Sequence, residues 1–263
     1  MRSRRGFRAL PPGPRPPRTP DDPARVIEDK IKECVRRSGH PRPGSRILVA
    51  MSGGKDSFAV AFGLKRLRGG YGWEVEGAHV APTVDGKKIS AWDVVEEQAK
   101  ILEIHAYLLE PESDVLELKE EMNARKVCYA CRTLRRIELG QLAEEKGFDY
   151  IALGHTLDDA AATVILSLLT GAERLKLLWY TGTWRGGPRL IRPLVRCPEA
   201  VTKALAEELK VDTVMTEDVC PYAGGLRDEV EEFLDRLERE WIPHVKGNVV
   251  GTALRTLRGR QCH

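Results

Sequence analysis

The apolar positions of this chain alternate between two spacings. Short runs of consecutive apolar and β-branched residues are typical of buried parallel strands, and we expect strands at 46–51, 74–80, 104–109, 150–153 and 189–195. Between these runs, apolar residues recur every three or four positions, which predicts helices at 58–67, 90–102, 114–125, 134–146, 158–169 and 198–209. Strands that alternate with helices predict an α/β fold with a doubly wound parallel sheet.

Helices are also expected on both sides of this alternating region. Asp22 followed by Pro23 is typical of a helix start, and apolar residues from 26 to 35 have helical spacing. The Gly69-Gly70 pair is expected to end the helix at 58–67. A long charged helix is expected at 226–241, and the sequence contains no internal repeat.

Charge is unevenly distributed along the 263 residues, which include 42 Lys and Arg and 39 Asp and Glu. Residues 1–20 carry six Arg, six Pro and no acid, and 246–263 carry four basic residues and no acid, so the rest is net negative. Basic ends suit a polyanion such as nucleic acid, although Arg and Pro are equally typical of a disordered, soluble tail. With no apolar run long enough for a membrane span or signal peptide, we expect a soluble, cytoplasmic protein.

The segment Ser52–Ser57, S-G-G-K-D-S, lies between an expected buried strand and an expected helix. A glycine-containing turn at a helix N-terminus binds anions through backbone N–H groups, and Gly53 and Gly54 let a phosphate approach closely. Lys55 adds a cation, and the two serines add hydroxyl donors. A carboxylate at Asp56 would repel phosphate unless a cation lies between them, which indicates Mg²⁺. The alternative is a tight turn that binds nothing.

A second polar segment, Gly154–Asp159 with the sequence G-H-T-L-D-D, follows the expected strand at 150–153. Carboxyl ends of parallel strands meet at one edge of a sheet, so this segment is expected beside Ser52–Ser57. The alternative is that its two aspartates only complement the dipole of the following helix. His79, at the end of the strand at 74–80, is a weaker candidate.

Three cysteines form a candidate metal site. Cys128 and Cys131 are a C-x-x-C pair, and Cys220 lies in a loop that contains Pro and Gly. Without a second C-x-x-C, a four-cysteine zinc site is poorly supplied, and a redox dithiol or a persulfide-carrying cysteine remain alternatives. A position at a helix start is expected to lower a thiol pKa. The other cysteines are expected to be structural or, at the chain end, too frayed to bind a metal: Cys34, Cys197 and Cys262.

The motifs S-G-G-K-D-S, C-x-x-C, G-H-x-x-D-D and C-P-Y, together with Arg192-Pro193-Leu194, resemble a known family across roughly residues 22–250. It is the PP-loop ATP pyrophosphatase superfamily and, within it, the iron-sulfur-dependent tRNA 2-thiolation enzymes. The resemblance implies an adenine-nucleotide α-hydrolase-like fold with ATP, Mg²⁺ and a 4Fe-4S cluster held by Cys128, Cys131 and Cys220. It also implies a set of nucleotide-binding residues: Ala50, Ser52, Gly53, Gly54, Lys55, Asp56, Ser57, His79, Gly154 and Asp159.

The resemblance further implies a mechanism with Asp56, Arg135 and Cys220 as catalytic residues. The C2 carbonyl oxygen of a tRNA pyrimidine attacks the α-phosphorus of ATP and pyrophosphate leaves. Sulfide bound at the open iron of the cluster then replaces AMP. Free sulfide or a sulfur-carrier protein would be the sulfur donor, and a homodimer is left open. The alternatives are an amide-forming PP-loop ligase, or an iron-sulfur or nucleotide-sensing module without enzymatic activity.

Two departures from the family pattern change these expectations. The cysteine-rich zinc ribbons that some relatives carry at both ends are missing, so zinc is not expected and the basic ends are expected to replace ribbons in tRNA binding. Arg135 stands where some relatives have lysine and cannot act as a base. We expect a basic tail at 1–20, a PP-loop ATPase domain at 21–215, and a helical segment at 216–263 that supplies Cys220 and a second basic tail.

Overall fold

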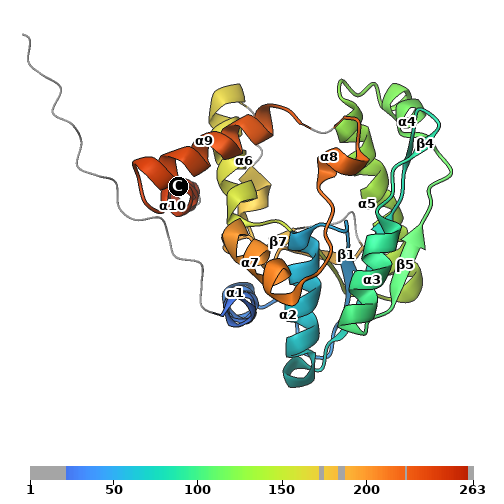
Figure 1. Ribbon diagram of the computed structural model, residues 1–263, viewed down its shortest axis with the longest axis horizontal. Coiled ribbons are helices and arrows are strands. Elements are labelled where there is room, and N and C mark those ends of the chain that lie inside the picture. Colours follow the sequence, from blue (N-terminus) through green and yellow to red (C-terminus); the bar gives the residue numbers. More distant parts are fainter. Residues whose placement is uncertain (1–21, 172–174, 183–186, 223, 260–263) are drawn as a thin grey trace, which may run out of the picture.

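The computed structural model describes residues 22–171, 175–182, 187–222 and 224–259, so the expected tail at 1–20 and Cys262 lie outside the described residues. Figure 1 shows helices on both sides of a central sheet. The strands are β1 Arg46–Ala50, β2 Glu74–Val80, β3 Thr83–Val84, β4 Lys87–Lys88, β5 Ala106–Leu109, β6 Tyr150–Ala152, β7 Thr181–Gly182 and β8 Arg189–Ile191. The helices are α1 Pro23–Ser38, α2 Lys55–Tyr71, α3 Trp92–Leu102, α4 Val115–Glu121, α5 Val127–Lys146, α6 Leu157–Thr170, η1 Leu175–Leu178, α7 Glu199–Leu209, α8 Thr216–Val219, α9 Leu226–Glu240 and α10 Val245–Gly259.

The central sheet has six strands in the order β5-β2-β1-β6-β8-β7. All neighbouring pairs are parallel except β7 with β8, and β3 and β4 form a separate antiparallel pair. From β1 the chain proceeds outward through β2 to β5 and then returns to the other side of β1 with β6. The predicted doubly wound parallel sheet is therefore confirmed, with its topological switch point between β1 and β6.

Apolar side chains pack on both faces of this sheet. On one face, α1, α2, α3 and α7 bury a core that includes Ile27, Ile31, Phe58 and Leu205. On the other face, α5 covers the sheet with Leu139, Leu142 and Ala143. Helices α1 and α2 approach closely at Gly63, because a Cβ there would lie 2.4 Å from Cδ1 of Ile31. Because helices pack on both faces of the sheet, β1 and β6 are buried, and this fixes the positions of the loops that follow them.

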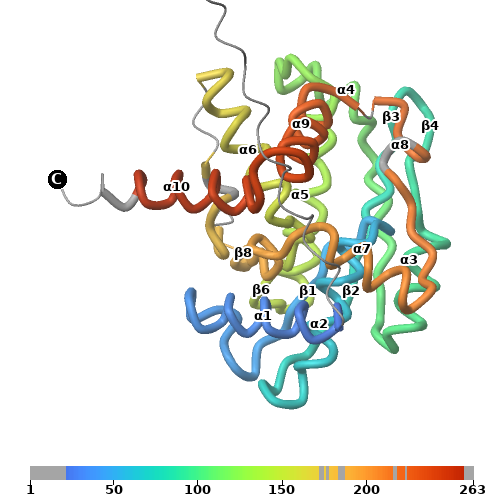
Figure 2. Tube along the Cα trace, turned by 60° about the vertical axis from the view of Figure 1, so that its left-hand side comes forward, coloured from blue at the N-terminus to red at the C-terminus, as the bar shows by residue number. Residues whose placement is uncertain are grey.

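The C-terminal helices form a third packed unit on α6. Val230 and Leu234 of α9 and Val245 and Val250 of α10 are buried together with Ala160–Ala162 of α6. Figure 2 shows α10 extending away from the sheet, with α9 beside α6. The expected helical C-terminal extension is present, and it reaches the helix that follows the second motif. No helix in the described part of the chain is long and apolar enough to cross a membrane.

Several element boundaries differ from the sequence-based expectation. Helix α2 continues through Gly69 and Gly70 and ends only at Gly72, whose φ of 69° is left-handed. Helix α5 begins at Val127 rather than near 134, so both cysteines of the C-x-x-C pair lie within it. Strand β8 ends at Ile191 instead of 195, because Pro193 has no N–H to donate. The β3–β4 hairpin and β7 were not expected, and α10 was expected only as part of the helical segment at 216–263, without bounds of its own.

Candidate active site

The S-G-G-K-D-S segment forms a loop between β1 and α2 that its own hydroxyl groups hold in shape. The N–H of Ser52 donates to Oγ of Ser57 at 3.1 Å, and the N–H of Gly54 donates to Oγ of Ser52 at 3.3 Å. Gly53 has a left-handed φ of 84°, and a Cβ there would lie 2.9 Å from Cγ2 of Val214. The loop therefore needs glycine at this position, and it leads directly into the N-terminus of α2, which attracts anions.

Lys55 and Asp56 at the start of α2 are held by side chains from α7. Nζ of Lys55 lies 3.3 Å from Oδ2 of Asp56 and also contacts Glu199, while the hydroxyl of Thr202 donates to Oδ1 of Asp56. Burial raises the pKa of Asp56 to about 6, and Lys55 and Thr202 only partly oppose this. Burial disfavours the Lys55 ammonium, but the carboxylates of Asp56 and Glu199 raise its pKa above the ordinary value. Lys55 is thus charged and already paired with carboxylates.

The second motif lies against the loop, as its position after β6 predicts. A Cβ on Gly154 would lie 2.9 Å from the backbone N of Ser57, so only glycine allows this approach. Asp159 belongs to a capping box, in which its Oδ2 accepts from the N–H of Thr156 at 2.8 Å. Its other oxygen accepts from Nη1 of Arg227 on α9 at 2.9 Å. Asp159 is therefore fixed from two sides next to the loop.

Asp158 has a different role from its neighbour. It is 5% exposed, accepts from the N–H of Glu199 at 2.8 Å, and contacts Nζ of Lys246 on α10. Burial alone would lower the pKa of Lys246, but the carboxylates of Asp158 and Asp235 outweigh it and raise that pKa. Asp158 therefore joins α6, α7 and α10, which is more than the dipole interaction considered for it from sequence.

The two remaining candidates for nucleotide binding lie at strand ends of the same edge. Ala50 is the last residue of β1 and is half-buried. His79 in β2 is buried, its Nδ1 lies 2.8 Å from the carbonyl oxygen of Met51, and its Nε2 accepts from the N–H of Ala91 at 3.2 Å. Burial lowers the pKa of His79. Its neutral ring joins β2 to Met51 after β1 and to Ala91 at the start of α3, with both nitrogens bonded, so any contact with a nucleotide would come from its backbone.

The fold brings the three candidate cysteines together from two distant segments. Sγ of Cys128 lies 3.6 Å from the carbonyl oxygen of Tyr222, 94 positions later in the chain. Cys131 and Cys220 pack against the same small core as Val84 and Leu134. Burial raises the pKa of the Cys131 thiol, and nearby Cys220 and Cys128 raise it further. This is the opposite of the lowered pKa expected at a helix start, because burial outweighs the helix terminus.

Arg135 lies one turn beyond Cys131 on α5. Its positive charge opposes the rise in the Cys131 pKa and lowers the pKa of His79. Its Nε is buried and has no hydrogen-bond partner among the residues that the structure describes. Arg135 is therefore a cation between the cysteines and the edge of the sheet that carries the phosphate loop.

The three thiols suit an iron-sulfur cluster better than a single metal ion. In the described part of the chain, no three Cys, His, Asp or Glu side chains are arranged to hold one ion. A cluster takes each thiolate on a different iron, so its ligands need not converge on one point. Cys128, Cys131 and Cys220 are free thiols of the correct donor type. By contrast Cys34 and Cys197 are fully buried, and burial raises the pKa of each to about 12.

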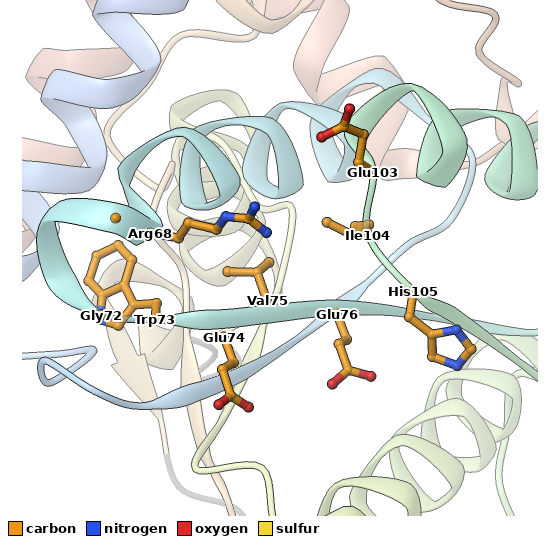
Figure 3. Close-up of a pocket in the computed structure, with 10 residues that line it drawn as sticks. Arg68, Gly72, Trp73, Glu74, Val75, Glu76, Glu103, Ile104 and His105 are labelled. Carbon is orange, nitrogen blue, oxygen red and sulfur yellow. The ribbon is translucent and has the colours of Figure 1, made fainter.

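A cavity of about 570 Å³ lies away from these motifs, near the start of β2 and the residues that precede β5. Figure 3 shows its lining, with Glu74, Glu76 and His105 along the strands and Arg68 on α2. The two glutamates are already partnered, Glu74 with Arg46 at 2.9 Å and Glu76 with Tyr107 at 2.8 Å. This cavity is at the amino ends of the strands, where doubly wound folds do not bind their nucleotides.

Several side chains of the site had no signal in the sequence. They share the feature that they reach the two motifs from α7, α9 and α10, far along the chain: Glu199, Thr202, Arg227, Glu231 and Lys246. Burial raises the pKa of Glu231 to about 7, and it accepts from Nη1 of Arg227 at 3.2 Å. The only local hint was the acidic first turn of α7.

An anion-binding loop at the switch point of a doubly wound sheet defines a nucleotide-binding α/β protein. A family model described as the PP-loop domain matches residues 23–218. The chain therefore belongs to the PP-loop family and, within it, to the tRNA 2-sulfurtransferases, which confirms the resemblance noted in its motifs.

Two relatives support this placement, and a solved structure has the same fold. The chain is 31% identical to a tRNA-cytidine(32) 2-sulfurtransferase of Anaeromyxobacter dehalogenans, with 83% of this chain and 74% of the relative covered. It is 30% identical to a tRNA-5-methyluridine(54) 2-sulfurtransferase of Thermus thermophilus, with 88% and 72% covered. A U34-tRNA thiolase of Methanococcus maripaludis, solved with its [4Fe-4S] cluster, has the same fold. The TM-score is 0.75 at 23% identity, over 90% of this chain and 80% of the other.

Proposed function

We propose that this protein uses ATP to adenylate the C2 carbonyl oxygen of a pyrimidine in tRNA and then replaces that oxygen with sulfur. One observation carries the proposal: Cys128 and Cys131 lie beside the segment that contains Cys220, on the same edge of the sheet as the phosphate loop. An amide-forming ligase would have no use for three thiols there. The names of the relatives, which act on cytidine 32 or 5-methyluridine 54 of tRNA, supply the substrate class.

The phosphate loop would bind ATP through the backbone N–H groups at the N-terminus of α2. Lys55 is paired with Asp56 and Glu199 in the structure. Phosphate oxygens would take the place of Glu199 against the ammonium, and Asp56 would hold Mg²⁺ against the phosphates. Positioning of the α-phosphorus near the attacking oxygen, with its charge neutralised, supplies the rate of adenylation.

Two partners fix the carboxylate of Asp159, so Asp159 is suited to contact the ribose or the metal of a bound nucleotide. Arg227 donates to one oxygen at 2.9 Å, and Thr156 donates to the other at 2.8 Å. A carboxylate that is held in this way orients its ligand without reorganisation. We infer that Asp159 orients the ribose or the metal, and that Arg227 keeps it from turning away.

Cys128, Cys131 and Cys220 would hold a 4Fe-4S cluster, which offers an open iron for sulfide. The chain contributes two things around these thiols. Burial keeps the Cys131 thiol protonated until iron displaces the proton, and Arg135 adds a positive charge next to it. That charge would attract the anionic hydrosulfide that must replace AMP. Free sulfide or a carrier protein would be the donor.

The cysteines provide the direct test of this function. Cys128→Ala, Cys131→Ala and Cys220→Ala are each expected to abolish formation of 2-thionucleosides while ATP binding stays within about twofold of wild type. The reason is that none of the three thiols touches the phosphate loop. The protein would be reconstituted without oxygen with iron and sulfide and given Mg·ATP, sulfide and unmodified tRNA. Thionucleosides would be measured by mass spectrometry and ATP binding by calorimetry.

Cys34→Ala is the matched control, because this thiol is fully buried in α1 and its pKa is about 12. It should keep both activities. Thiolation that survives loss of any of the three cysteines would remove the cluster from the proposal. An iron-free wild type that forms AMP and pyrophosphate with an amine acceptor would instead identify an amide-forming ligase.

A further inference from the structure

Four buried side-chain nitrogens of the described residues have no hydrogen-bond partner, and three of them lie at the carboxyl edge of the sheet. These three are Nε of Arg135 on α5, Nδ1 of His155 after β6, and Nε of Arg192 after β8. Buried polar groups are normally hydrogen-bonded, so several unpartnered nitrogens at one edge indicate a missing ligand. All three can act as donors, which indicates that the ligand is an acceptor of hydrogen bonds.

Arg192 is the most unusual of the three. It is only 6% exposed, and its guanidinium donates from Nη1 to the carbonyl oxygen of Trp179 at 3.2 Å. No carboxylate of a described residue lies within 4.0 Å of it. Burial, with a smaller contribution from neighbouring Arg136, lowers the pKa of Arg192 to about 10. A buried guanidinium that faces another arginine, with no acid of the described residues beside it, is stabilised when an anion neutralises it.

The surroundings of Arg192 are built around its planar head group. A Cβ on Gly182 would lie 3.2 Å from both Nη1 and Nη2, so glycine in β7 leaves the space that the guanidinium fills. The N–H of Arg192 donates to the carbonyl oxygen of Tyr180 at 2.7 Å, which anchors the residue against β7. The guanidinium is therefore held in one place, which favours bidentate contact with a planar or tetrahedral oxyanion.

His155 adds a neutral donor beside this cation. Burial lowers the pKa of His155 to about 4, because the opposing effect of Asp159 is itself offset by Arg192, Arg227 and Arg132. Its imidazole is therefore uncharged at pH 7. A neutral ring with a free Nδ1 can donate one hydrogen bond to an anion without adding to the positive charge around Arg192.

We propose that Arg192 and His155 form a binding site for a phosphate group at the carboxyl end of β8, separate from the phosphate loop after β1. The phosphate is either a backbone phosphodiester of the tRNA or the α-phosphate of the nucleotide. Only the first source rests on the proposed function. A site of this kind fixes the substrate at a second point, so that the base enters between the loop and the cysteines.

The test follows His155 by nuclear magnetic resonance in protein labelled with ¹³C-histidine. Loss of one signal in His155→Gln assigns it. Titration of the wild type with inorganic phosphate is expected to shift the His155 signal and to raise its pKa, because an anion beside Arg192 favours the charged imidazole. Arg192→Gln should weaken that response by about tenfold or more, since a charged hydrogen bond is lost. Arg25→Gln, on the exposed side of α1, should respond as the wild type does.

Two further titrations identify the source of the phosphate. A His155 shift on addition of unmodified tRNA assigns the backbone phosphodiester, and a shift on addition of Mg·ATP assigns the nucleotide. If Arg192→Gln does not fold, Arg192→Lys takes its place, because it keeps the charge and loses the planar fork. The proposal is overturned if phosphate, tRNA and Mg·ATP all leave the wild-type signal unmoved, or if the variant responds like the wild type. These signals do not depend on thiolation, so a failure of the proposed function would be seen separately.

Discussion

Gly154 is the residue at which the two nucleotide-binding motifs touch. Its missing side chain lets the end of β6 lie against the backbone of Ser57, where a Cβ would be 2.9 Å from the amide nitrogen. Gly154→Ala is therefore expected to lower the free energy of unfolding by about 1–3 kcal/mol, because backbone cannot move aside as a flexible side chain can. ATP affinity should fall as well. Urea denaturation and calorimetric titration would measure the two effects.

Gly69 provides the matched control for this substitution. It lies inside α2, and a Cβ there meets nothing within 4 Å. Gly69→Ala should raise the free energy of unfolding by about 0.5–1 kcal/mol, since alanine loses less backbone entropy in a helix. Equal effects of the two substitutions would mean that Gly154 is not the contact point between the motifs.

Asp56 and Glu231 make the stability of the protein depend on pH in a defined direction. Burial raises the pKa of Asp56 to about 6 and that of Glu231 to about 7, so the folded state holds these protons more tightly than the unfolded state. Their stabilising effect is complete below about pH 4 and is lost as pH rises through 6 to 7. Glu231→Gln should remove part of this loss, on the order of 1–2 kcal/mol. Melting temperatures between pH 5 and 8 would measure it.

The control for this comparison is Asp29→Asn on α1, where the side chain is 60% exposed. This variant should keep the wild-type decline in melting temperature between pH 5 and 8. A Glu231→Gln variant that declines as steeply as the wild type would show that Glu231 is ionised in the folded protein at every pH in that range.

Among the helices, α10 contacts the active site through the buried ammonium of Lys246. Lys246 contacts Asp158 and Asp235, and Asp158 accepts from the N–H of Glu199, which itself pairs with Lys55. Lys246→Met is expected to lower the free energy of unfolding by about 3–5 kcal/mol, because it leaves Asp158 buried without its cation. The KM for ATP should rise, since α7 loses its support. Urea denaturation and ATP titrations would measure both.

A second variant separates the buried charge from the packing of α10. Asp158→Asn combined with Lys246→Met removes both charges, and it should be more stable than Lys246→Met alone. Lys100→Met on α3, where the side chain is 63% exposed, should be close to wild type. A double variant that is less stable than Lys246→Met would show that Lys246→Met loses stability because the ion pair is gone, and not because the Asp158 carboxylate is left unpaired.

The elements also show why some of the site was predictable and some was not. Both motifs follow strands directly, so local pattern and the parallel sheet were sufficient to place Ser52–Ser57 beside Gly154–Asp159. Thr202 reaches Asp56 across 146 positions and Lys246 reaches Asp158 across 88, and no local pattern encodes such pairs. The bounds of α10 within the expected helical segment were not predicted, because Gly247 and Gly251 interrupt its apolar spacing and packing against α6 decides its structure.

For the whole molecule, charge distribution leads to a prediction about RNA binding. Residues 21–245 are net acidic, and six of the arginines lie in residues 1–20. Deletion of 1–20 is expected to weaken tRNA binding and to reduce the dependence of log affinity on log salt concentration by about 0.7–0.9 per lost phosphate contact. ATP affinity should be unchanged. Filter binding at 50–200 mM salt would measure the slope, and an unchanged slope would exclude this segment from tRNA binding.

The pairing of β1 with β6 has a consequence for how the protein acquires its activity. Arg46 and Asp149, at the start of this pairing, are 103 positions apart, so the pairing of the two strands closes a loop that contains β2, β5 and three long helices, α2, α3 and α5. Parallel pairing over such a distance is slow, because the entropy of loop closure opposes it before any contact compensates. Helix formation in a refolding experiment should therefore precede the recovery of nucleotide binding. The delay between the two signals would measure the time that the central sheet needs to form the β1–β6 pairing.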